Sequence, residues 1–196
     1  MGLPYFSSVM FDCQEYSYEK NLEWTKEYVK NYSDQVLVEG IMEMLNVEGG
    51  TVARHVDNYC ERAAEYVKTT GVDFFVADLG TEQQTTAVGG AKYDRERARR
   101  LTQALDRHML VLHGTSCLTN DQVRGLADDG VLRVNMWTRI VREAGQYAAE
   151  NLVNRIAEVR RGEFEAAEGN AYIRDNVEKA AEIMEEMMEL FGYANW

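Results

Sequence analysis

The sequence predicts an α/β fold in which a parallel sheet is covered by helices. Short β-branched or aromatic runs alternate five times with longer stretches of helical periodicity, and no hairpin signal interrupts the alternation. Each apolar run ends in a polar or glycine-rich turn, and the turns at 112–116 and 134–138 carry unusual polar residues. Polar chemistry at the carboxyl ends of successive strands is typical of the active face of a (β/α) barrel.

Five segments are predicted to be strands because they are short, apolar and rich in β-branched or aromatic residues. They are Ser7–Asp12, Val36–Met42, Val72–Leu79, Met109–His113 and Val131–Met136. Helical periodicity follows each of them. The predicted helices cover Tyr18–Tyr32, Val56–Thr69, Asp94–His108, a short stretch from 120 or 121 to 128, Thr138–Arg161 and Asp175–Phe191. Gly71 is expected to end the second helix, and Asp94 to cap the third.

The chain is expected to form a single domain over residues 1–196, because its length and its apolar content of 45% suit one globular core. A complete eight-stranded barrel needs about 250 residues, so five strands fit in this chain and three do not. The net charge of −12 disfavours binding to nucleic acid or to an anionic membrane surface. There is no long apolar run, no signal peptide and no metal-site spacing among the three cysteines, so a cytoplasmic location is expected.

Five segments with distinctive motifs occur in order along the chain. They are SSVMFDCQEYSYEKNLEWTKEYV, VLVEGIMEM, ERAAEYVKTTGVDFFVADLGTEQQ, LVLHGTSCLTNDQVRGLADDGVLRVNMWT and IRDNVEKAAEIMEEMMELFGYA. The first four resemble the motifs SVMxDGS, VEAELG, FVxxTGVDxLAxxIGTAHG and LVLHGGSGIPDEDIRKAIxxGVxKVNVNT of the class II, metal-dependent ketose-bisphosphate aldolases, and the fifth is similar to that family's C-terminal helix.

This resemblance implies a partial (β/α)8 TIM barrel containing strands four to eight with their helices. In the family the third strand ends in a His-x-Asp-His motif that carries a catalytic acid and a zinc ligand, and the resemblance places that strand outside this chain. We therefore expect either a second polypeptide that supplies the first three strands, or a homo-oligomer in which copies cover one another's open edges.

The resemblance also implies roles for residues at the strand ends. His113 matches a zinc ligand, and the alternative is a histidine hydrogen-bonded inside the barrel mouth. Gly114, Ser116, Asn135 and Thr138 match positions that hold the substrate phosphate and the ketose hydroxyls. For Gly114 and Ser116, simple turn chemistry is the alternative.

Acidic residues follow the first two predicted strands. Glu48 is the nearest counterpart of the family's general base, although Gly49 falls at that place if the register shifts by one residue. Asp12 and Glu39 match family acids, and both are expected to be ordinary buried carboxylates held by hydrogen bonds.

Four residues depart from the family pattern, and one of them is Ile41, which stands where VEAELG has its second glutamate. Gln83 stands where the family has a zinc-binding histidine, and a carboxamide is a poor zinc ligand. Glu82, its neighbour, is a possible substitute. Zinc is therefore expected only with ligands from a partner chain. Gln84 replaces a glycine and Trp137 replaces an Asn or Asp beside the anion pocket, which indicates a changed or blocked substrate.

Together these observations predict a subunit of a split class II aldolase-like enzyme that makes or breaks a carbon–carbon bond in a small-molecule ketose, expected to be phosphorylated. The alternative is a non-catalytic binding or regulatory subunit that has lost the zinc site. A group of arginines on the third predicted helix is expected to be a solvated or salt-bridged surface rather than an anion site. This group contains Arg95, Arg97, Arg99, Arg100 and Arg107.

Overall fold

The computed structural model describes residues 3–45, 58–81, 92–163 and 170–195. The chain divides into two compact units, Met1–Asn135 and Met136–Trp196. Among the helices of these described segments, none has the length and apolar character required to cross a membrane.

The first unit contains a five-stranded parallel sheet in which the strands lie in the order of the sequence. They are β1 (Ser8–Phe11), β2 (Leu37–Ile41), β3 (Phe74–Val76), β4 (Leu110–Leu112) and β5 (Val131–Val134). Sequential parallel strands with helices between them are the arrangement of a (β/α) barrel. The prediction of five parallel strands is therefore confirmed, although each strand is shorter than predicted.

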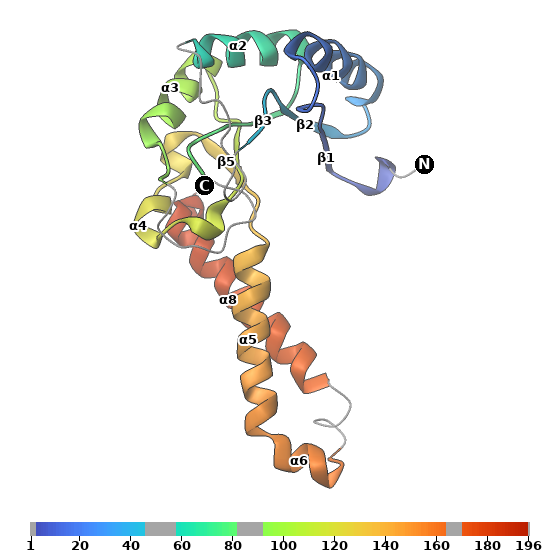
Figure 1. Cartoon of the computed structure of the whole chain (residues 1–196), viewed down its shortest axis with the longest axis vertical. Coiled ribbons are helices and arrows are strands. Elements are labelled where there is room, and N and C mark those ends of the chain that lie inside the picture. The colour runs from blue at the N-terminus through green and yellow to red at the C-terminus, as the bar shows by residue number, and fades with distance from the viewer. Residues whose placement is uncertain (1–2, 46–57, 82–91, 164–169, 196) are drawn as a thin grey trace. The chain divides into compact units, whose positions relative to one another are not determined.

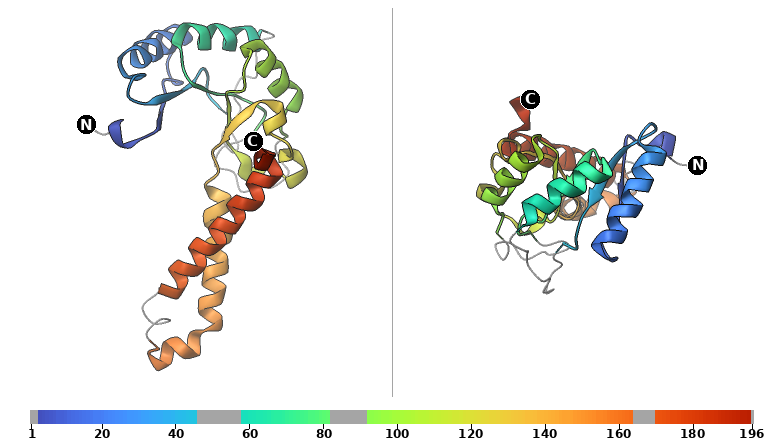
Figure 2. Two further views of the ribbon diagram at one scale, coloured as in Figure 1. Left: turned by 180° about the vertical axis from the view of Figure 1, so that it is seen from behind. Right: turned by 90° about the horizontal axis from the view of Figure 1, so that it is seen from above.

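Helices lie between the strands of the first unit. The longer ones are α1 (Tyr18–Tyr32), α2 (Tyr59–Thr70) and α3 (Arg95–Leu105), and the short elements are α4 (Asn120–Val123), η1 (Leu3–Tyr5), η2 (Thr115–Cys117) and η3 (Ala127–Asp129). Helix α2 packs beside both α1 and α3 along one face of the sheet (Figure 1 and Figure 2).

Two predicted helix ends are confirmed and one predicted helix is wrong. Asp94 caps α3, since its Oδ1 accepts a hydrogen bond from the Arg97 backbone N–H at 2.9 Å. Gly71 ends α2 with a left-handed φ of 75°. The predicted helix to residue 128 is instead the single turn α4 followed by η3, because Gly125 has a φ of 72° and interrupts the helix.

One side of the sheet, the outer face, packs against the helices. The Phe11 ring stacks on Tyr28 of α1 with centroids 4.3 Å apart, and the Phe75 ring lies 6.0 Å from Tyr66 of α2. Gly40 also belongs to this face, because a Cβ at this position would lie 2.7 Å from Val72 Cγ1, just before β3, and 3.1 Å from Tyr66 Oη of α2. The outer face therefore leaves no room for a larger residue where β2 passes beneath α2.

The opposite side, the inner face, carries a small apolar core. Strand register places Ile41 beside Val76, and Val76 beside Val111, with their side chains on the same side. These three residues and Leu45 form one buried cluster, against which Phe74 packs. The core thus lies where the interior of a barrel would be.

An irregularity between β4 and β5 determines what else lies on the inner face. The register shifts so that Val111 pairs with Arg133, and Leu132 is left as an extra residue. The Arg133 guanidinium donates a hydrogen bond to Ser8 Oγ at 2.8 Å. Because Ser8 belongs to β1 and Arg133 to β5, the sheet is curved strongly enough to bring its first and last strands within reach of one side chain.

The second unit is helical and contains α5 (Thr138–Asn154), α6 (Ile156–Arg161), α8 (Asn170–Phe191) and η4 (Tyr193–Asn195). Helices α5 and α8 pack against each other (Figure 1 and Figure 2). The predicted helix over 138–161 is wrong as a single element, because Arg155 (φ −97°, ψ 13°) leaves the helical region and separates α5 from α6. The last helix begins at Asn170 instead of Asp175.

Candidate functional site

The carboxyl ends of β4 and β5 bring two of the predicted site residues into contact. His113 directly follows β4 and Asn135 directly follows β5, and the Asn135 backbone N–H donates to the Leu112 carbonyl at 3.0 Å. This hydrogen bond holds the two strand ends side by side. The Nδ2 atom of Asn135 lies 2.7 Å from Nε2 of the His113 ring.

The carboxylate of Glu39 on β2 joins this pair. Its Oε1 lies 3.3 Å from His113 Nε2, and its Oε2 lies 3.3 Å from the Arg133 guanidinium. Glu39 is only 2% exposed, and a buried carboxylate is stable only when charged or polar partners surround it. The expectation of a buried, hydrogen-bonded Glu39 is confirmed. Asp12 differs, because its exposed carboxylate accepts hydrogen bonds from Gln14 in a local turn beyond β1.

Gly114 and Ser116 stand immediately after His113. Gly114 has a left-handed φ of 73°, which favours glycine, and it begins the short turn η2 in which Ser116 is buried. Thr81, which follows β3, donates a hydrogen bond from Oγ1 to the His113 carbonyl at 2.6 Å. The ends of β3 and β4 are therefore connected at His113, an interaction that the sequence did not predict.

The remaining predicted residues belong to the second unit or to parts of the chain that the structure does not describe. Thr138 is the first residue of α5, in the second unit, and the neighbouring Trp137 is 78% exposed. Five residues fall outside the described parts of the chain: Glu48, Gly49, Glu82, Gln83 and Gln84.

Sequence reasoning missed a second polar group beyond the end of β3. The buried Asp78 donates its backbone N–H to Tyr59 Oη at 3.1 Å, and the Asp78 carbonyl accepts a hydrogen bond from Arg97 at 3.1 Å. Burial raises the pKa of the Tyr59 hydroxyl, so this group remains a neutral hydrogen-bond partner. A tyrosine at a helix start and an arginine on another helix give no local signal of such a contact.

Glu43, just after β2, is another carboxyl that the sequence analysis did not single out. Burial raises its pKa, while the Arg62 guanidinium 4.0 Å away acts in the opposite direction. The only sequence signal for it is its place in VEGIMEM, shortly after the strand that carries Glu39.

The described residues do not by themselves fit a zinc site. In these parts of the chain no three His, Cys, Asp or Glu side chains are grouped so that they could hold a metal ion. His113 Nε2 faces Glu39 and Asn135, and the second oxygen of Glu39 faces Arg133. A catalytic zinc ion normally needs three protein ligands, so His113 alone is insufficient.

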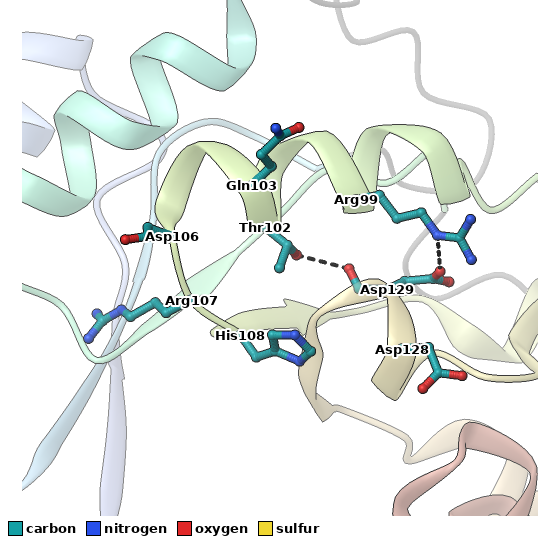
Figure 3. A pocket seen from close by; sticks show the side chains of 8 residues that line it. All are labelled: Arg99, Thr102, Gln103, Asp106, Arg107, His108, Asp128 and Asp129. Atoms are coloured by element: carbon teal, nitrogen blue, oxygen red, sulfur yellow. Dashed lines mark hydrogen bonds and ion pairs between the residues drawn. The ribbon is translucent and has the colours of Figure 1, made fainter.

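A separate pocket of about 370 Å³ lies beside α3, near residues that precede β4 and therefore at the opposite end of that strand from His113 (Figure 3). Asp129 lies within its wall, and both Arg99 and Arg95 pair with this carboxylate at 2.8 and 3.4 Å. The expectation of a salt-bridged surface is confirmed for these two arginines. The pairing indicates a structural role for this region of α3.

Comparison with known proteins places this arrangement in a family. Residues 3–196 match the model of the family described as fructose-bisphosphate aldolase class-II. The chain belongs to the class II fructose-bisphosphate aldolase family. The predicted resemblance is thereby confirmed.

Curated members of this family align with nearly the whole chain. The fructose-bisphosphate aldolase of Streptococcus pneumoniae serotype 4 is 26% identical over 201 residues, which cover 95% of this chain and 64% of that protein. The fructose-bisphosphate aldolase of Streptococcus pyogenes serotype M3 is 26% identical over 204 residues, covering 97% of this chain and 66% of that one. The chain thus spans slightly less than two thirds of the length of these relatives.

Solved structures of aldolases show the same fold. Fructose-bisphosphate aldolase from Campylobacter jejuni superimposes with a TM-score of 0.77 at 19% identity, covering 95% of this chain and 60% of that one. The YdjI aldolase from Escherichia coli K12 gives a TM-score of 0.65 at 21% identity over similar shares. The five-stranded parallel sheet is therefore consistent with part of a TIM barrel.

Proposed function

We propose that this chain is one subunit of a split class II aldolase-like enzyme, in which a second polypeptide supplies the remaining strands of the barrel. The substrate class is a ketose that carries phosphate, and the reaction forms or breaks a carbon–carbon bond. The observation that carries the proposal is the contact of His113, Asn135 and Glu39 at the carboxyl ends of three strands, the end at which barrel enzymes bind their substrates.

The need for a second polypeptide is supported by the free edge of β1. Within the described residues no strand pairs with β1 on the side away from β2. Met10 on this strand is 38% exposed, and Phe6 just before it is 60% exposed. An uncovered edge with apolar side chains invites pairing with another chain. The aligned aldolases extend beyond the matched region, which supports further strand–helix units as the segment that would complete the sheet.

The helical layer is open at the same edge. A groove of about 250 Å³ runs between β1 and α1, and it is lined by Phe11, Trp24, Tyr28 and Tyr32 among others. In this sheet α2 lies beside α1, so the groove is the place where the helix of a preceding strand–helix unit would continue the layer. An amphipathic helix of the second polypeptide is therefore the proposed occupant.

The chemistry assigned to this chain is binding and orientation. In an aldol cleavage, the bond between the carbon next to the ketone and the hydroxyl-bearing carbon breaks, the hydroxyl loses its proton, and the ketone fragment gains one. Asn135 and the turn at Gly114 would contact the oxygen atoms of the substrate. Zinc in the assembled barrel would need ligands that the second polypeptide supplies.

The proposal is tested by purifying the tagged chain from its native source and determining the mass of the assembly by light scattering. We expect a stoichiometric complex with a chain that contains a strand ending in His-x-Asp-His, and we expect this complex to cleave fructose 1,6-bisphosphate or a related ketose phosphate. A stable, monodisperse species of 22.4 kDa that binds no further polypeptide would overturn the proposal.

A matched pair of variants then tests the site. Asn135→Ala should lower kcat/KM at least about tenfold without dissociating the complex, because a lost hydrogen bond to a charged group costs about 1.5–3 kcal/mol. The control is Asn58→Ala, which removes an exposed asparagine that forms no side-chain cap hydrogen bond. Equal activity of the two variants would exclude Asn135 from the site.

The second candidate function is a binding or regulatory subunit without catalysis. It is favoured by the engagement of His113 Nε2 with Glu39 and Asn135, since this nitrogen already has protein partners. Metal analysis of the purified complex distinguishes the two functions. Stoichiometric zinc with ketose-phosphate cleavage supports the enzyme, whereas a stable complex that lacks both supports the regulatory subunit.

A further inference from the structure

The His113 ring faces two groups with opposite requirements at a single nitrogen. The carboxylate oxygen Glu39 Oε1, 3.3 Å from Nε2, can only accept a hydrogen bond. The Asn135 Nδ2 group, 2.7 Å from Nε2, can only donate one. In the neutral ring Nε2 either carries a proton or offers a lone pair. The two contacts therefore cannot both be favourable unless the asparagine amide turns its oxygen to the ring.

Of the two contacts, the one with the Glu39 carboxylate has the larger effect on whether Nε2 carries a proton. If Nε2 carried a lone pair, that lone pair would face the oxygen of a carboxylate that is itself buried, since Glu39 is 2% exposed. If Nε2 carries a proton, the hydrogen bond to the carboxylate is charge-assisted, and such bonds are roughly twice as strong as neutral ones. Arg133 at 3.3 Å fixes the other carboxylate oxygen, so Glu39 cannot easily rotate away.

The Asn135 amide can adapt to this arrangement. Within the described residues the structure gives its side chain one hydrogen-bonding contact, the one with the His113 ring. Rotation of the amide by half a turn places Oδ1 beside Nε2 and breaks no other hydrogen bond that the structure shows. Because Glu39 favours a proton on Nε2, the Asn135 amide can turn so that its Oδ1 accepts a hydrogen bond from Nε2.

We propose that Glu39 is a positioning residue that holds the proton of His113 on Nε2 and thereby turns the Asn135 amide so that its NH₂ group is left for the ligand. This assignment rests on the proposed function for its significance, and it narrows the ligand class. An amide that presents two N–H donors binds oxygen acceptors, such as the phosphate or the carbonyl and hydroxyl oxygens of a ketose phosphate. The carboxylate–imidazole pair acts in the manner of outer partners that fix the tautomer of a functional histidine.

The proposal is tested by nitrogen-15 NMR of the full chain with labelled histidine, in the assembly in which it is purified, at a pH of about 8.5, which lies above the reference pKa of histidine. We expect the His113 ring to show the pattern of the Nε2–H tautomer, with a directly detected Nε2 proton that exchanges slowly with water. The signal is assigned by its loss in His113→Gln. A ring in the Nδ1–H tautomer would overturn the proposal without any mutation of Glu39.

A pair of carboxylate variants tests the cause of the tautomer. Glu39→Gln should abolish the slowly exchanging Nε2 proton signal. Glu43→Gln is the matched control, because Glu43 follows the same strand but faces Arg62 instead of the histidine, and it should leave the signal unchanged. Persistence of the signal in a folded Glu39→Gln variant would refute the positioning role. If that variant does not fold, the tautomer of the unmodified protein still decides.

The outcomes separate this inference from the proposed function. A complex without ketose-phosphate cleavage would remove the enzyme but would leave the histidine tautomer as measured. Conversely, an active enzyme with an Nδ1–H histidine would retain the function and would exclude Glu39 from the positioning role.

Discussion

Neutralising Asp129, beside α3, should destabilise the first unit. This carboxylate is fully buried and has three donors around it, namely Arg99 Nε at 2.8 Å, Tyr93 Oη at 3.1 Å and Arg95 Nε at 3.4 Å. In Asp129→Asn the shape is kept, but the charge is lost. One carboxylate oxygen also becomes an NH₂ group that faces a donor.

The magnitude follows from the exposure of the partners. Breaking a buried ion pair costs about 3–5 kcal/mol when the remaining charge stays buried. Here the side chains of Arg99 and Arg95 are 59% and 39% exposed, so both guanidinium groups can regain water. The loss then corresponds to the charge-assisted hydrogen bonds, and we expect the free energy of unfolding to fall by about 2–3 kcal/mol.

Urea denaturation followed by circular dichroism measures this loss. With a slope of about 2 kcal/mol per molar urea, the midpoint should fall by roughly 1–1.5 M. Asp128→Asn is the matched control, because the neighbouring Asp128 carboxylate is exposed, and its midpoint should shift by less than about 0.3 M. If the two variants had equal midpoints, the buried ion pair would contribute nothing, and the reasoning from burial would be wrong.

Three further predictions concern the packing of the helices and the response to alkali. Gly40→Ala would place a Cβ 2.7 Å from Val72 Cγ1, and it should lower the free energy of unfolding measured in urea by about 1–3 kcal/mol. Its control is Gly145→Ala in α5, where the nearest atom to the new Cβ is 3.8 Å away. This variant should leave the free energy of unfolding unchanged or raise it by up to about 1 kcal/mol. Tyr66→Phe removes a hydroxyl that forms hydrogen bonds with two buried side chains and with the end of β2, and it should lower the free energy of unfolding by about 1–2 kcal/mol. Its control is Tyr16→Phe, at an exposed tyrosine, which should lower it by less than about 0.5 kcal/mol. Burial raises the pKa of Tyr66, so the folded protein keeps the proton that the unfolded chain releases above pH of about 10, and thermal stability should fall as the pH rises through that value. A melting temperature that stays constant well above that pH would contradict this sign, and Tyr66→Phe should make the alkaline decline shallower.

The sequence predicted the order of the elements better than their ends. Asp94 and Gly71 were identifiable because a helix cap and a left-handed glycine act through neighbouring residues. The break at Arg155 was not predictable, because neither glycine nor proline marks it. The third strand is three residues long instead of eight, and at its carboxyl end the backbone of Asp78 bonds Tyr59 and Arg97 instead of a neighbouring strand.

In the candidate site, too, the features with a local sequence signal were predictable and those that depend on distant residues were not. His113 and Asn135 could be found because each directly follows an apolar strand and stands in a recognisable motif. The partnership of Glu39 with His113 joins residues 74 positions apart, and only the register and curvature of the sheet bring them together. The role of Arg133 depends on the irregular register of β5, since without the extra residue its side chain would project from the other face.

The hydrogen bond from Arg133 to Ser8 has a consequence for assembly. It joins the first and last strands of the described sheet within one unit, so it limits how far these two strands can move apart. For the proposed second polypeptide, this pre-organisation would favour docking of an already folded segment over mutual folding, because less conformational entropy is then lost on association. Loss of this hydrogen bond would then weaken the association of that polypeptide, while leaving the contacts of His113 with Glu39 and Asn135 in place.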